Sequence, residues 1–96
     1  MSYSFNALGD SKEEAKQVVA RLFDQHVVAT QPVHAKDRSA VLANANAAID
    51  LLVDVPADKR VSVACNGWVN FNGTEQEPEL QAVTISTSVT LVNKEQ

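Results

Sequence analysis

Two histidines and one cysteine are the residues of this sequence best suited to nucleophilic or metal chemistry. His26 and His34 stand eight positions apart, and Cys65 is distant from both. Zinc sites pair their ligands about two to five residues apart, and that spacing is missing here. No histidine or basic residue stands close to Cys65 in the sequence to activate it. We therefore expect Cys65 in the core, His26 at a helix end, and His34 as a local cap with Asp37, with no catalytic residue, metal ligand or cofactor.

Carboxylates offer a second kind of chemistry, the binding of a hard cation such as calcium. They gather in two segments: Asp54 and Asp58 on either side of Pro56, and the alternating Glu75, Glu77 and Glu79. The ligand pattern of an EF-hand and its glycine are absent, so solvated acidic loops are expected. The sequence also has no G-x-S-x-G nucleophile motif and no glycine-rich phosphate loop. No reaction type is indicated.

Composition limits the class of protein. The chain of 96 residues fits one domain, residues 1–96, with 45% hydrophobic and 21% charged residues. A net charge of -4 argues against binding a phosphate backbone, so no nucleic-acid partner is expected. A single cysteine cannot form an internal disulfide, and neither a signal peptide nor a membrane span is recognisable. A cytoplasmic protein is the simplest expectation.

Hydrophobic periodicity predicts the elements that must position any site. Residues 2–8 alternate with period two and predict a short strand. Ser11 and Glu14 form a capping box ahead of an apolar helical stripe, which predicts a helix that ends before Pro32. A second, alanine-rich helix is expected from about residue 35 to residue 53.

The second half of the chain returns to period two. Residues 61–71 and 81–92 predict two strands, joined by an acidic hairpin connection over residues 72–80. The inner face of these strands is predicted to carry Val61, Val63, Cys65, Val69, Phe71, Val83, Ile85, Val89 and Leu91. The order β-α-α-β-β predicts an α+β two-layer sandwich, in which a helical hairpin packs on one face of a three-stranded sheet. The neighbour of the first strand remains open.

Trp68 is the unusual residue of the predicted sheet. Alternation places it on the face away from the helices, in a field of uncharged polar residues that comprises Asn66, Asn70, Thr84, Ser86 and Ser88. An aromatic residue in a charge-free surface is typical of an interface core. We predict this set as a binding surface. The alternative is a β-bulge at Gly67 that turns Trp68 inward.

The opening SYSF, the helix start SKEEA, the connector QPVHAKD and the terminal Val/Ser/Thr-alternating strand together resemble short accessory proteins of tailed bacteriophages. The resemblance implies a virion component or a protein that engages a host factor, located in the virion or the host cytoplasm. It carries over no functional residue.

Three functions compete on these observations. The first is a non-enzymatic interaction or assembly module, a homo-oligomer or a binder of a phage or host protein, with no membrane partner. The second is a nucleotide- or sugar-binding protein with a site between protomers, lined by Trp68, Asn66 and Asn70 with neighbouring hydroxyls. The third is a hydrolase, which lacks a discernible set of acid, base and nucleophile.

Overall fold

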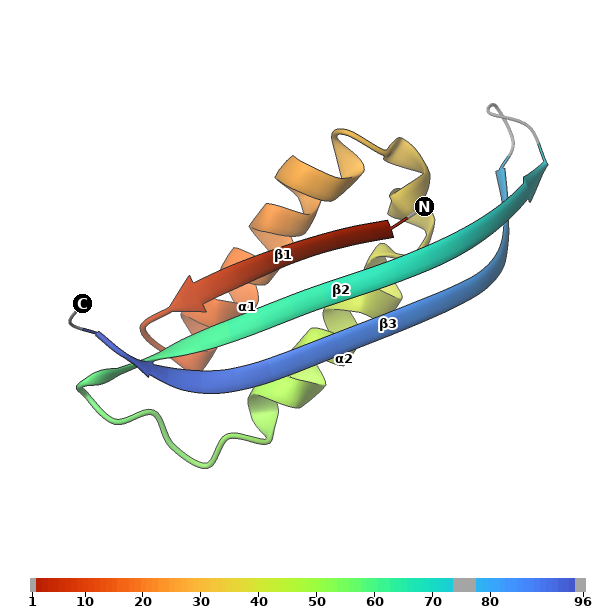
Figure 1. The fold of residues 1–96 in the computed structure, drawn as a ribbon. Coiled ribbons are helices and arrows are strands. Elements are labelled where there is room, and N and C mark those ends of the chain that lie inside the picture. Colours follow the sequence, from red (N-terminus) through yellow and green to blue (C-terminus); the bar gives the residue numbers. More distant parts are fainter. Residues whose placement is uncertain (1, 74–77, 95–96) are drawn as a thin grey trace.

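The computed structural model describes residues 2–73 and 78–94. Two of its helical elements are α-helices, η1 is a π-helical turn and η2 is a 3₁₀ turn. The elements follow the order β1 (Ser2–Gly9), α1 (Lys12–Leu22), η1 (Phe23–Val28), η2 (Pro32–Lys36), α2 (Arg38–Asp50), β2 (Lys59–Gly73) and β3 (Pro78–Asn93). Figure 1 shows the strands as one layer with both helices behind it. The predicted two-layer β-α-α-β-β fold is confirmed.

The sheet is antiparallel with the order β1-β2-β3, so β1 pairs with β2, which answers the question that the sequence left open. The pairing of β2 with β3 extends to Gly73 and Pro78, which makes the connection shorter than the predicted 72–80. Residues 74–77, with Glu75 and Glu77, lie outside the described residues. Glu79 lies within β3 and is not part of a loop.

The first helical segment begins as predicted and continues differently. The Ser11 hydroxyl accepts a hydrogen bond from the Glu14 amide at 3.0 Å, and the Glu14 carboxylate accepts from the Asp10 amide at 2.8 Å. The capping box thus reaches one residue further back than expected. After Leu22 the helix continues as the wider π-helical turn η1, in which Phe23 and Val27 are buried.

The second helix is shorter than predicted, because residues 32–36 form the separate turn η2 and α2 starts only at Arg38. Pro32 stands at the first position of η2, where its missing N–H costs no hydrogen bond. Asp37 occupies the N-cap position of α2, yet its side chain makes no capping hydrogen bond.

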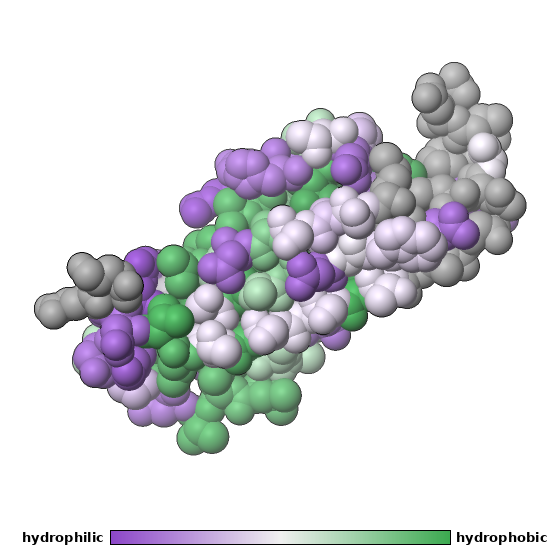
Figure 2. Space-filling view, viewed as in Figure 1, coloured by the Kyte–Doolittle hydropathy of each residue, from purple (hydrophilic) through white to green (hydrophobic). Residues whose placement is uncertain are grey.

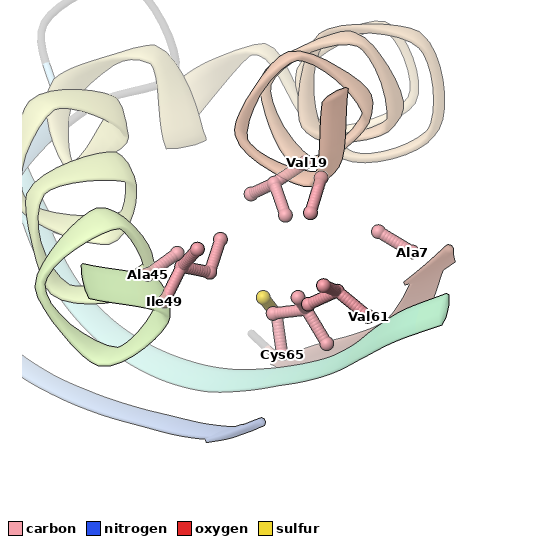
Figure 3. Close-up of a cluster of buried hydrophobic side chains, with 8 residues drawn as sticks. Ala7, Val19, Ala45, Ile49, Val61 and Cys65 are labelled. Atoms are coloured by element: carbon pink, nitrogen blue, oxygen red, sulfur yellow. The ribbon is translucent and has the colours of Figure 1, made fainter. Parts of the chain in front are cut away.

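The core lies between the helices and the sheet. Its fully buried members come from both helices and from β1 and β2: Ala7, Ala15, Val19, Ala45, Ile49, Val61, Val63 and Cys65. Figure 3 shows Val19 of α1 and Ile49 of α2 facing Val61 and Cys65 of β2. A second cluster of Phe23, Val27 and Val41 packs against Tyr3, Phe5, Val28 and Ile85. The predicted inner-face positions of Val69, Phe71 and Val83 lie outside the described side chains.

None of the helices in the described ranges is long and apolar enough to cross a membrane.

Candidate functional site

Trp68 points away from the helices, as alternation predicted. The ladder runs without a break through Gly67, and Trp68 lies opposite Ser2 of β1 and Thr84 of β3. Its side chain is 48% exposed. The register irregularity falls between Asn70 and Phe71, beyond Trp68. The alternative of a bulge at Gly67 that turns the indole inward is therefore wrong.

Gly67 explains why the strand stays regular here. A Cβ atom at this position would lie 2.2 Å from Cζ of Tyr3, so the tyrosine ring occupies the space that a side chain would fill. The ring also packs edge-on against Phe23 and His34, with centroid distances of 5.4 and 5.1 Å. Because neighbouring side chains alternate between faces, the inward glycine leaves Trp68 outward.

A shallow, open depression of about 560 Å³ lies beside the indole. It is lined by Ser2, Tyr3, Ser4, Asn66, Gly67, Trp68, Thr84 and Ser86. Four of the six predicted binding residues therefore meet in one place. The other two, Asn70 and Ser88, are exposed further along β2 and β3 and are not part of the lining. In Figure 2 this face of the sheet is mostly pale, which marks side chains of intermediate hydropathy.

The lining determines which chemistry the depression supports. Hydroxyls and the Asn66 amide both donate and accept hydrogen bonds, and the indole adds apolar area with one N–H donor. Among the lining residues that the structure describes, none is a carboxylate, a histidine or a basic residue. These groups can hold a partner by hydrogen bonds and by apolar contact with the indole.

A buried polar cluster lies on the opposite side of β1, in the connector between the helices. His34 is fully buried, with Nε2 at 2.7 Å from Gln31 Oε1 and Nδ1 at 3.3 Å from Asp37 Oδ2. The glutamine oxygen can only accept, so Nε2 donates to it, while Nδ1 faces the Asp37 carboxylate. Tyr3 Oη and Asp37 Oδ1 are buried with no hydrogen-bond partner among the described residues. Burial, and then the Asp37 carboxylate, raise the pKa of the Tyr3 phenol.

The predicted association of His34 with Asp37 is present, but the capping role is wrong. No side chain caps α2, and His34 lies buried inside the connector, where its ring nitrogens contact Gln31 and Asp37. A His–Asp pair is the arrangement that activates nucleophiles, but Asp37 is only 2% exposed and His34 is sealed beneath Tyr3. The pair is therefore closed to solvent in this structure. The spacing Q-x-x-H-x-x-D was the one available sequence signal, and apolar periodicity does not detect it.

Cys65 is confirmed as a core residue at 1% exposure. Burial raises the pKa of its thiol to about 11, against a smaller lowering by a hydrogen bond with Thr87. The Thr87 hydroxyl in turn accepts a hydrogen bond from Asn44 of α2 at 2.8 Å. His26 is exposed near a helix end, as predicted. Within residues 2–73 and 78–94, no three His, Cys, Asp or Glu side chains gather as metal ligands.

Comparison of the chain with protein-family models, with curated proteins and with solved structures finds no match.

Proposed function

We propose that this protein is a non-enzymatic interaction module that binds a protein partner through the outer face of its sheet. The observation that carries the proposal is Trp68, half-exposed over a depression whose described lining residues are all uncharged. Aromatic anchors surrounded by uncharged contacts are the usual energetic centre of a protein interface. The resemblance to phage accessory proteins supports a partner in the virion or the host.

The indole gives a direct test, because Trp68 is the single tryptophan of the sequence. Docking of a protein on this face moves the indole out of water, so its emission shifts to shorter wavelength and acrylamide quenches it less. Trp68→Ala is expected to weaken binding by about 2 kcal/mol or more, the range of an interface hot spot, while the thermal melt stays close to that of the parent. Ser86→Ala, at the rim of the depression, is the matched control with a smaller effect.

Two results contradict the proposal. Loss of folding in Trp68→Ala would show that the indole supports the core. A folded variant with unchanged assembly and unchanged partner binding would remove Trp68 from the interface.

The second candidate is a small-ligand binder, favoured by the amide and hydroxyl groups of Asn66, Thr84 and Ser86 beside an aromatic ring. A thermal-shift and fluorescence-quenching series with nucleotides and sugars separates the two candidates. A saturable response that Trp68→Ala abolishes favours the ligand, and no response favours the protein partner.

A further inference from the structure

The outer edge of β3 has the properties of a strand that pairs with another chain. The sheet order leaves β1 and β3 as its two edges, and no described strand pairs with the outer side of Pro78–Asn93. Such an edge presents unpaired N–H and C=O groups that act as a template for a further strand. β3 is 16 residues long, whereas β1 is only 8 residues long.

The usual protections of an edge are confined to the first two residues of β3, Pro78 and Glu79, and to the register irregularity beside them. From Leu80 to Asn93 the sequence has no charged residue and no proline, and the register irregularity lies opposite Asn70, at one end of this stretch. Natural edge strands prevent pairing by charges, prolines, bulges or shortness. β3 is thus competent for pairing over most of its length.

The helix beside this edge is also uncharged between its two end residues. Between Ser39 and Ile49 α2 has no charged residue, although much of it is exposed. Asn44 donates to Thr87, which identifies the side of α2 that lies next to β3. Residues at helical spacing from Asn44 share this side, and Ala40, Ala47 and Leu51 are all exposed. We call these four residues, with the outer edge of β3, the edge surface.

Apolar exposure is concentrated at one end of the edge surface. Leu51 is 83% and Val53 101% exposed just after α2, and Leu91 of β3 is 36% exposed. The chain from Val53 leads to Asp58, whose carbonyl oxygen accepts from the Lys94 amide, so these residues lie at the same end of the sheet as Leu91. Figure 2 shows the corresponding hydrophobic protrusion below the sheet.

We propose that a second copy of this chain pairs with the edge surface, antiparallel along β3, and forms one continuous six-stranded sheet with α2 packed against its counterpart. A two-fold axis pairs β3 with itself in the antiparallel sense, so the surface is complementary to its own copy. Two chains of charge -4 repel one another, and a charge-free contact keeps that repulsion small. A contact of nine paired residues along β3 would be about 30 Å long. A contact of that length also aligns the helix layers of the two copies. This surface is distinct from the Trp68 face.

The test is sedimentation velocity on the full chain over a concentration series, with one charge added to each helix in turn. Ala47→Glu places two carboxylates at the proposed contact and is expected to raise the dimer dissociation constant at least about ten-fold. Gln17→Glu adds the same charge to the exposed side of α1 and leaves the constant unchanged. Both substitutions are at exposed helical positions and introduce a good helix former, so the fold survives.

Two further readouts locate the contact. Those amides between Ser86 and Leu91 that face the outer edge should exchange more slowly as protein concentration rises, while those of β1 do not respond. Trp68 emission should stay constant during dimerisation, because the indole lies on the outer face. A chain that is monomeric at all concentrations overturns the proposal. A dimer that resists Ala47→Glu and is lost in Trp68→Ala also overturns it, and in that case supports the function proposed for the outer face.

Discussion

The two helices bury similar apolar stripes but are stabilised in different ways. α1 carries five charged residues, a Ser11 cap and an acidic first turn, whereas α2 has no side-chain cap. Residues of α1 and η1 bind the two ends of α2. Lys12 Nζ donates to the Leu52 carbonyl oxygen at 2.9 Å, and Arg38 forms a bidentate ion pair with Asp24 of η1.

The difference teaches how a small domain keeps one side uncharged. The charges of α2 stand only at its ends, where Arg38 pairs with Asp24 of η1 and Asp50 pairs with Lys16 of α1, so the turns between them carry none. Stability of α2 then depends on tertiary packing, and its exposed side is left neutral beside β3.

The largest expected effect is in the sheet, against which both helices pack. Val63 is fully buried in β2 beneath them, so Val63→Asp should cost about 3 kcal/mol or more and unfold the domain, because the carboxylate is buried without a partner. Asn66→Asp, on the exposed face of the same strand, is the matched control and should melt near the parent in circular dichroism. A stable Val63→Asp variant would place the strand register off by one residue.

The next effect tests whether α2 depends on packing. Ile49→Ala removes its largest buried side chain and should cost about 2–5 kcal/mol in urea unfolding. Native-state hydrogen exchange should accelerate more in α2 than in α1. Equal acceleration in both helices would mean that they open as one unit and that the contrast between them is wrong.

A third experiment measures how stability depends on ionisation of the buried Cys65 thiol. The Cys65 pKa is raised to about 11 from an ordinary 9.0, so the fold favours the neutral thiol. The contribution of this raised pKa to the free energy of unfolding is complete below pH 9 and is lost as the pH rises toward 11. Cys65→Ala should flatten that alkaline loss, and the native thiol should react with a thiol reagent far more slowly than the denatured one. Fast native labelling would contradict the burial.

Removal of the α1 cap should have a smaller effect. Ser11→Ala is expected to cost about 1 kcal/mol, since the Glu14 amide loses its acceptor. Ser39→Ala, an exposed serine in the first turn of α2 with no capping role, serves as the control and should be close to neutral. Similar losses of stability in Ser11→Ala and Ser39→Ala would contradict the conclusion that only α1 depends on a side-chain cap.

The smallest effect concerns the ion pair between η1 and α2. The Arg38 guanidinium lowers the pKa of the Asp24 carboxyl, so the pair contributes at neutral pH and is lost as the pH falls through that lowered value. Both side chains are largely in water, so Asp24→Asn should lower the melting temperature only slightly. The variant should lose less stability than the parent on acidification, and an identical acid profile would show that the pair contributes nothing.

The sequence predicted the elements and faces that follow a strict period. Alternation was sufficient to place Val63 inward and Trp68 outward, and the capping box located the start of α1. The order of the strands is a long-range choice that no local pattern contains. The burial of His34 was missed because it depends on Tyr3, thirty-one positions away, whose ring occupies the space above Gly67.

The candidate site was predicted in part for a similar reason. Trp68 and the five polar residues predicted around it share a face by period two, but only the strand register shows which of them lie side by side. Trp68, Asn66, Thr84 and Ser86 meet, while Asn70 and Ser88 are displaced along their strands.

The pairing of β1 with the central strand has a consequence for how the chain reaches this fold. Partners such as Gly9 and Val61, or Ser2 and Trp68, are separated by more than fifty residues, whereas β2 and β3 are neighbours in sequence. Closing such a long loop costs entropy before any contact compensates for it. We therefore expect the β2–β3 hairpin and the helical hairpin to form early and β1 to dock last. Until β1 docks, β2 would have an open edge, so the rate of that step would set how long the new chain is exposed to misassembly.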